Sequence, residues 1–448
     1  MFTLIILLHL ALAIEISIIE LVRRKNKIII FDFLTSANIF FLIGYCIVPL
    51  YYLNASRYIE IMPNSFYLDN VAIYIFLAYQ FFILGWGLFR RKKYNFKSHS
   101  QIGQIDYKWL KMAYFSFFIL LLMMILVVIG DGGISKYLSG ALSRYSVEEQ
   151  EVGGFAFLSR LTNVLPFIAA IFFYFLINKD KEHNYKYIKI FFLLTTVLTV
   201  FQIIGGASRG GMVRFFLLLF LVYILVKNKL KIIPLSILSV LAFLFIIYGK
   251  QTFYATANFI SKGESFYESF KYMDNIRNDA GKEGNSLFFT EFSHPYKSLD
   301  ASIRYENKNY EYTYFRDFYW SVLRIFPSRL VSIFLERPEP IHILNTSLLT
   351  GVSGVGGIPP GLIASFYYSL GILGIFLASF LYGALGTVLN NYFNKMINSS
   401  KIYYVPLVFF SYFYGFFIVN GDPNIYIYYI LSPIIFMFFL KFIRNVDR

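Results

Sequence analysis

The stretch FFLLTTVLTVFQIIGGASRGGMVRFFLLLFLVYILV, residues 191–226, decides the fold class. Two long apolar runs flank GGASRGG at 205–211, and each run is long enough to cross a bilayer as a helix. The stretch therefore predicts two membrane helices joined by a tight turn. An arginine, Arg209, stands between the two glycine pairs of that turn, and its position needs a physical reason.

The rest of the chain has the same apolar character. Hydrophobic residues make up 57% of the sequence and aromatic residues 21%, whereas only 15% are charged. Such a composition predicts an all-α polytopic integral membrane protein and excludes a soluble one. Eleven transmembrane helices are expected, at about 2–22, 28–52, 68–89, 109–130, 155–178, 188–206, 211–226, 232–250, 359–389, 402–420 and 425–441.

The net charge of +15 is explained by membrane topology, so no nucleic-acid partner is expected. Basic clusters lie on alternate connections between the expected spans, and the positive-inside rule places these connections in the cytoplasm. The N-terminus is then outside, the C-terminus cytoplasmic and GGASRGG on the outer face. The clusters are RRKNK, RRKKYNFK, KDKEHNYKYIK, KNKLK, NKMINSSK and KFIRNVDR.

The expected spans divide the chain into three parts. Residues 1–250 hold spans one to eight, 251–358 form a large external loop with short helices, and 359–448 hold spans nine to eleven. Residues 2–22 are expected as an uncleaved helix, because the positive charges follow the apolar run instead of preceding it. The single cysteine, Cys46, allows no disulfide, and no metal-ligand spacing occurs, so neither a metal nor a cofactor is expected.

Two interpretations fit Arg209. In the first, Ser208 is the N-cap of a helix that starts near Gly210, and Arg214 follows about one turn later. The helix N-terminus and two guanidinium groups then form an anion site at membrane depth. In the second, Arg209 only extends to the lipid headgroups, and the glycines only make a tight turn.

A second glycine-rich segment, 351–386, begins another helix on the outer side. Its proline pair, Pro359 and Pro360, suits the first turn of that helix. The glycines within the helix are expected to allow close packing against neighbouring helices. These are Gly371, Gly374, Gly383 and Gly386.

The external loop supplies candidates for catalysis. EFSHPYKSLD at 291–300 places Glu291 and His294 three residues apart, and a histidine near a carboxylate can act as a general base. FRDFYWSVLRIFPSRL at 315–330 adds charged residues, and several arginines together can hold a diphosphate. These are Arg316, Asp317, Arg324 and Arg329. The alternative is that all of them are solvated surface residues; His342, in the same loop, has no partner pattern around it.

Several of these segments resemble one family. GGASRGGMVRFFLLLF resembles a helix hairpin of the bacterial oligosaccharide repeat-unit polymerases of the Wzy type, and IPPGLIASFYYSLGILGIFLASFLYG resembles their late helix. FRDFYWSVLRIFPSRL and EFSHPYKSL resemble external-loop segments of the related enterobacterial common antigen polymerases. SRYS at 143–146 resembles a stretch of their earlier outer loop. The resemblance implies a GT-C-like membrane fold with its large external loop between spans eight and nine.

The resemblance also implies an activity. The protein would transfer a glycan from undecaprenyl diphosphate onto another lipid-linked repeat unit, at the outer face of the bacterial cytoplasmic membrane. Its partners would be the lipid-linked donor and acceptor, the lipid bilayer and a membrane protein that regulates chain length. The implied diphosphate-binding residues are Ser208, Arg209, Gly210, Arg214, Arg316 and Arg329. The implied catalytic residues are His294, Glu291 and Asp317, and the implied sugar-binding residues are Arg144, Tyr145 and Trp320.

Three other functions remain open at this point. An O-antigen-ligase-like glycosyltransferase would use the same donor and the same arginines with a different acceptor. A lipid-linked oligosaccharide flippase or transporter would more usually show internal repeats and midplane charges. A purely structural partner of the export machinery would not need Arg209.

Overall fold

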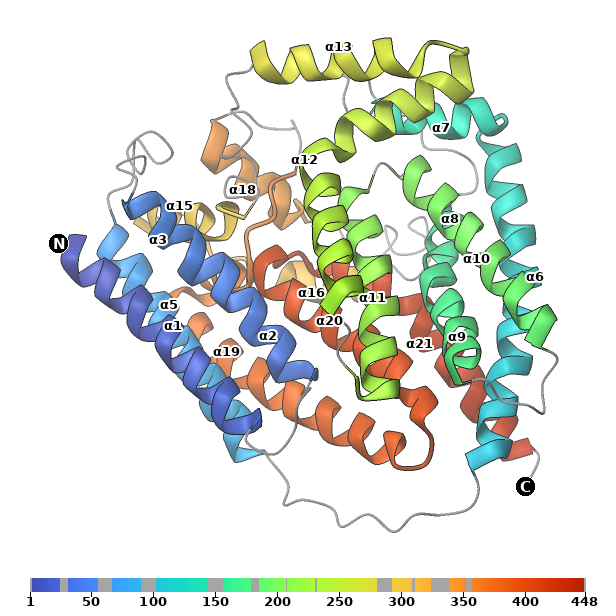
Figure 1. The fold of residues 1–448 in the computed structure, drawn as a ribbon. Helices are drawn as coiled ribbons and strands as arrows, with labels where there is room; N and C mark the ends of the chain where they lie inside the picture. Colours follow the sequence, from blue (N-terminus) through green and yellow to red (C-terminus); the bar gives the residue numbers. More distant parts are fainter. Residues whose placement is uncertain are drawn as a thin grey trace. The chain divides into compact units, whose positions relative to one another are not determined.

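The computed structural model describes twelve stretches of the chain, and every regular element in them is a helix (Figure 1). These stretches are residues 2–24, 31–54, 67–89, 102–143, 156–178, 185–206, 208–229, 232–279, 292–307, 311–323, 338–351 and 357–446. The prediction of an all-α polytopic membrane protein is confirmed at this level.

Ten helical stretches within the described residues are long and apolar enough to cross a membrane, against eleven expected. They are Thr3–Arg24, Phe33–Tyr52, Leu68–Leu88, Tyr107–Gly130, Leu158–Asn178, Tyr185–Gly205, Arg209–Lys227, Leu362–Ile397, Lys401–Asn420 and Pro423–Leu440. The remaining expected span, 232–250, forms the first part of α12 (Ile232–Lys262).

Helix α12 continues past residue 250 into the segment expected as external loop. No residue between 251 and 262 breaks the helix, and Phe253, Ala255 and Ala257 are buried along it. The helix ends at Gly263, which has a φ of +69°, a backbone conformation that glycine adopts without strain.

Contacts divide the chain into two compact units. The first comprises Met1–Phe96, Phe289–Met396 and Phe410–Tyr428, and the second comprises Lys97–Phe288, Ile397–Phe409 and Tyr429–Arg448. Two of the boundaries fall within helices, one in α20 (Tyr404–Asn420) and one in α21 (Pro423–Val446).

The first unit contains α1 (Phe2–Arg24), which runs beside α5 (Leu68–Leu88) (Figure 1). One side of α1 exposes large apolar side chains at helical spacing: Leu4, Leu7, Leu10, Ile14, Ile18 and Leu21. The opposite side buries Ile5, Leu12 and Ile16. An exposed apolar stripe of this length on a hydrophobic helix is the surface that lipid covers. The bilayer is therefore the environment of this helix.

Small residues bring α5 into direct contact with α19 (Leu362–Ile397). A Cβ atom added to Gly85 would lie 2.0 Å from the carbonyl oxygen of Phe380, and one added to Gly383 would lie 2.0 Å from that of Phe82. The two backbones touch at these glycines, as in other membrane helix pairs. The predicted packing role of Gly383 is thus confirmed.

Gly371 has a different role from the one predicted. Leu370 and Gly371 leave the helical conformation, and Gly371 has a φ of +60°, so α19 is broken there. The break frees two carbonyl groups of α19, those of Tyr368 and Ser369. They accept hydrogen bonds from the backbone N–H groups of Thr313 (2.9 Å) and Tyr314 (3.1 Å). The segment before α16 thereby pairs the backbone groups that the break leaves open.

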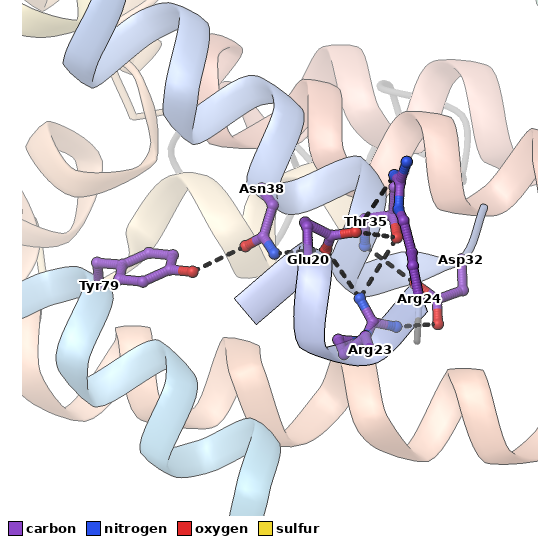
Figure 2. A network of polar contacts seen from close by, with 7 residues as sticks. All are labelled: Glu20, Arg23, Arg24, Asp32, Thr35, Asn38 and Tyr79. Atoms are coloured by element: carbon purple, nitrogen blue, oxygen red, sulfur yellow. Dashed lines mark hydrogen bonds and ion pairs between the residues drawn. The ribbon is translucent and has the colours of Figure 1, made fainter. Parts of the chain in front are cut away.

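Figure 2 shows a polar network that joins α1, α2 (Phe33–Leu42) and α5. Its members are Glu20, Arg23, Arg24, Asp32, Thr35, Asn38 and Tyr79. The Glu20 carboxylate accepts from Arg23 (2.9 Å), Thr35 (3.0 Å) and Asn38 (2.7 Å). The Asn38 side-chain oxygen accepts from Tyr79 (3.0 Å), and Arg23 reaches Asp32, the N-cap of α2. Charges at the end of the first apolar span are therefore paired inside the protein.

The second unit contains α6 (Ile102–Gly130), α9 (Leu165–Asn178), α10 (Tyr185–Gly205), α11 (Arg209–Lys227) and α12. One hydrophobic cluster joins four of these helices through Ala169, Ile203, Met212, Phe215 and Phe253.

Three shorter helices accompany them in the same unit: α7 (Ile134–Ser143), α8 (Ala156–Leu161) and α13 (Phe266–Asp279). Helices α7 and α13 both pack on α12 (Figure 1).

Candidate active site

The candidate residues are distributed over both units. Ser208, Arg209, Gly210 and Arg214 belong to the second unit, whereas His294, Arg316, Asp317 and Trp320 belong to the first. Four further candidates, Glu291, Arg329, Arg144 and Tyr145, lie outside the described residues, as does Arg324.

The turn between α10 and α11 has the predicted helix start. Helix α11 begins at Arg209, and Ser208 is its N-cap: the Ser208 hydroxyl accepts from the N–H of Gly211 at 3.1 Å. The cap satisfies one of the four N–H groups that a helix N-terminus leaves open. The prediction that Ser208 caps this helix is confirmed.

The two arginines of this turn are held by neighbouring groups. The half-buried side chain of Arg209 lies against Gly249 of α12, where an added Cβ would be 2.6 Å from Arg209 Cγ. Arg214 donates through Nε to the Gly210 carbonyl at 3.1 Å, and its guanidinium lies 4.1 Å from the ring centre of Tyr429. Two positive charges thus flank the first turn of α11, an arrangement that favours a bound anion.

The first unit contains a pairing that the sequence did not indicate. His342, in the first turn of α18 (Ile341–Thr350), places Nδ1 2.6 Å from Oδ2 of Asp422. The Asp422 side chain is fully buried, whereas that of His342 is 25% exposed. The two atoms are at ion-pair distance but not in hydrogen-bond geometry. With a proton on Nδ1, facing the carboxylate, Nε2 is the nitrogen that can accept one.

Asp422 is itself fixed by the turn that joins α20 to α21. Its Oδ1 atom accepts from the N–H of Asn424 at 2.8 Å, which caps α21. Gly421 precedes it with a φ of +66° and lies too close to Gly361 for any side chain. The two carboxylate oxygens of Asp422 therefore contact different groups: Oδ1 caps α21 and Oδ2 faces His342.

Asp317 lies in the same region, in α16 (Arg316–Leu323). The carboxylate is buried and accepts from the N–H of Ile341 at 3.1 Å. Burial raises the pKa of Asp317 to about 6; the hydrogen bond from Ile341 opposes this rise, the charge of Asp422 adds to it, and His342 opposes it. We call Asp317, His342 and Asp422 the Asp–His–Asp cluster.

His294, the base expected from the sequence, lies next to this cluster. It begins α15 (His294–Asn307), and its Nε2 atom lies 2.9 Å from the carbonyl oxygen of Val419, just before Asp422. A carbonyl only accepts hydrogen bonds, so Nε2 of His294 acts as a donor. His294 and His342 therefore flank the same turn, and His342 is the one that lies against the buried Asp422 carboxylate.

Arg316 and Trp320 differ in exposure. Arg316 is exposed at the first position of α16, whereas the Trp320 ring is only 7% exposed. The indole N–H of Trp320 has no hydrogen-bond partner in the described part of the chain. The exposed rings of this segment are instead Tyr314 (57%) and Tyr319 (49%). Stacking of a sugar on Trp320 would require the ring to become exposed.

Buried polar bonds hold the cluster's surroundings in place. Asn345 of α18 is fully buried and donates to the Ser298 hydroxyl and to the Ile358 carbonyl, both at 2.9 Å. Its side-chain oxygen accepts from Tyr368 of α19 at 3.0 Å. One amide thereby fixes α15, α18, α19 and the loop before α19 around the cluster.

A signal for Asp422 is present in the sequence. NGDPN at 420–424 combines a glycine, an aspartate and a proline, the order typical of a helix start between two apolar runs. An ionisable residue at such a position points to a functional partner. The partner itself, His342, lies too far away in the chain for spacing to indicate it.

Among the described residues, no group of three or more His, Cys, Asp or Glu side chains has the geometry to hold a metal ion. Comparisons with family models, with curated proteins and with solved structures found no match to this chain. The fold defines its class, a multi-pass α-helical membrane protein.

Proposed function

We propose that the protein is a glycosyltransferase of the cytoplasmic membrane of bacteria. It transfers a glycan linked to undecaprenyl diphosphate onto a second lipid-linked repeat unit at the outer face, and so polymerises a surface polysaccharide. The observation that carries the proposal is the His342–Asp422 pair, which lies between α16, α18 and the start of α21. Such a carboxylate-oriented imidazole is a general base, which glycosyl transfer to a sugar hydroxyl requires.

The cluster supports a defined proton transfer. His342 Nε2 takes the proton of the acceptor hydroxyl as the oxygen attacks the anomeric carbon of the donor. The bond from that carbon to the diphosphate breaks, and undecaprenyl diphosphate leaves with the bonding electrons. Asp422 stabilises the imidazolium that forms, as a buried carboxylate does for a catalytic histidine.

The turn before α11, in the second unit, is a candidate anion site of its own. Arg209 and Arg214 flank the first turn of α11, whose N–H groups and dipole favour negative charge. We propose that this turn binds the diphosphate of a lipid-linked glycan.

The test uses purified protein in liposomes with a synthetic repeat unit linked to a polyprenyl diphosphate. Product length is followed by gel for wild type, His342→Gln, Arg209→Ala and the matched control His294→Gln. We expect wild type and His294→Gln to make a product ladder at similar rates. His342→Gln should lower the rate of polymerisation about 10²–10⁴-fold, and Arg209→Ala should weaken binding of the lipid-linked donor.

The other functions give different results in the same liposomes. Transfer to a foreign acceptor without any ladder would identify a ligase. Lipid movement across the bilayer without transfer would identify a transporter. Equal ladders from wild type and His342→Gln, with both proteins folded, would contradict the assignment of His342 as the base.

A further inference from the structure

A half-buried lysine lies one helical turn from His294. Lys297 is on α15, and in the described structure its ammonium group forms neither an ion pair nor a hydrogen bond. Its backbone N–H donates to the Ser293 carbonyl at 3.2 Å. Burial lowers the pKa of Lys297 to about 8. An ammonium group that loses water without gaining a partner destabilises the fold, and such groups are typical of ligand sites.

The acidic residues around α15 already have partners. Asp300, on the same helix, is 3.0 Å from Arg304 Nε and also accepts from the N–H of Tyr67. Asp422 faces His342, and Asp317 accepts from Ile341. Among the described residues, these carboxylates form no ion pair with Lys297.

The geometry of α15 leaves Lys297 on a partly open side. Pro295, Tyr296, Ser298 and Leu299 are all buried against other elements. His294 and Lys297, three residues apart, lie on one helix face and are both only partly covered. A ligand that approaches His294 and the turn at 419–422 would also meet the Lys297 ammonium group.

We propose that Lys297 binds a carboxylate group on a sugar of the glycan, so that the protein takes an acidic repeat unit. The sugar in this inference rests on the proposed function. A single ammonium group suits one negative charge, whereas a diphosphate is usually held by two or more cations. Asp317 and Asp422 in the neighbouring cluster would also oppose a more highly charged anion.

The first experiment tests carboxylate binding without any enzymatic assay. The full-length protein in detergent is treated with acetic anhydride near pH 8, and acetylation of each lysine is measured by mass spectrometry. Glucuronate, glucose or inorganic pyrophosphate is added in separate samples, and the exposed Lys271 of α13 is the control lysine. We expect glucuronate to protect Lys297 and not Lys271, and glucose to protect neither.

Two outcomes would overturn the carboxylate assignment. Protection of Lys297 by pyrophosphate at lower concentration than glucuronate would make it a diphosphate contact. Absence of protection by any of the three probes would make the lysine a structural residue only.

The second experiment separates this inference from the proposed function. Lys297→Gln and Lys297→Arg are compared with wild type in the liposome assay, with acidic and neutral acceptors of equal length. We expect Lys297→Gln to raise KM for the acidic acceptor about tenfold or more and to leave KM for the neutral acceptor unchanged. Lys297→Arg should retain most of the affinity for the acidic acceptor. Equal KM values for both acceptors in wild type and Lys297→Gln would overturn the inference and leave the polymerase intact. Glucuronate protection with no transfer from any donor would instead retain the subsite and reject the polymerase.

Discussion

At the scale of single residues, the most consequential feature is that the two carboxylate oxygens of Asp422 contact different groups. One oxygen caps α21 and the other faces His342 Nδ1 at 2.6 Å. The imidazole is thereby held in one tautomer and one orientation. An amide at position 422 would keep the shape and the cap but would present a donor or a neutral acceptor to the ring.

Asp422→Asn is therefore expected to slow polymerisation about 10²–10⁴-fold with little change in KM, because the base loses its tautomer and the imidazolium its counter-charge. The liposome assay over a range of pH values measures this change. The control is Asn424→Ala, which keeps the backbone N–H that Asp422 caps. A normal rate for Asp422→Asn would mean that His342 needs no oriented tautomer.

Asp317 makes the fold sensitive to pH. Its pKa in the folded protein is raised from 3.8 to about 6, so the folded state holds the proton more tightly than the unfolded state. The free energy of unfolding therefore falls as pH rises from about 4 to about 6, and it levels off above the folded pKa.

Asp317→Asn should remove this dependence while keeping an oxygen that accepts from Ile341. Between pH 4 and pH 7, the free energy of unfolding of the variant should rise by about 1–3 kcal/mol relative to that of wild type. Unfolding of both proteins in detergent at several pH values measures the difference. A difference that stays constant with pH would show that Asp317 ionises normally.

At the scale of elements, the break in α19 depends on a single glycine. Gly371 has a φ of +60°, and a Cβ there would lie 2.6 Å from the Tyr312 hydroxyl. That hydroxyl donates to Glu306 at 2.5 Å, and the bond raises the pKa of Tyr312 to about 12. The break, Tyr312 and Glu306 are in contact, and together they attach the segment before α16 to α19.

Gly371→Ala is expected to destabilise the protein by about 1–3 kcal/mol, because it adds both strain and a clash. The matched control is Gly87→Ala on α5, where an added Cβ meets nothing within 4 Å. The control should be neutral or stabilise the helix by about 0.5–1 kcal/mol. Thermal unfolding in detergent compares the two; equal stabilities would mean that α19 can straighten without loss.

The network in Figure 2 has a similar role between α1, α2 and α5. Glu20→Ala would leave Arg23, Thr35 and Asn38 without their shared acceptor. We expect the free energy of unfolding to fall by roughly 3–5 kcal/mol. Arg24→Ala is the control, since Arg24 is 43% exposed and its ion pair with Glu20 should contribute no more than about 1 kcal/mol. Similar unfolding temperatures for Glu20→Ala and Arg24→Ala would contradict the view that this network holds α1, α2 and α5 together.

At the scale of the whole molecule, the orientation derived from the basic clusters can be tested with the chain's own chemistry. Cys46 is the single cysteine and is buried, so wild type should react poorly with maleimides. Tyr267→Cys on α13 and Tyr185→Cys on α10 introduce exposed thiols, at positions 70% and 48% exposed. In intact cells a membrane-impermeant maleimide should label position 267 and not position 185, and permeabilised cells should label both. The reverse pattern would invert the topology.

How far the sequence could predict the molecule depends on the range of each interaction. The apolar runs and the Ser208 cap depend on neighbours in the chain, so they were predicted well. The end of α12 was placed too early, because polarity increases after residue 250 although the first residue that ends the helix is Gly263. Gly371 was assigned to packing, since nothing local distinguishes a packing glycine from one at a break. The His342–Asp422 pair connects distant segments, and a single sequence contains no signal for such a pair.

The position of Asp422 has a consequence for biogenesis. A ribosome makes His342 well before it makes Asp422, and the turn that carries Asp422 lies between α20 and α21. During synthesis the imidazole therefore lacks its carboxylate until nine of the apolar helices in the described part of the chain have been made. A chain stalled or cut before α21 would contain His342, His294 and both arginines of α11 but would have an unoriented base. In the proposed enzyme, catalytic competence is thus acquired only after the segment that carries Asp422 has been made.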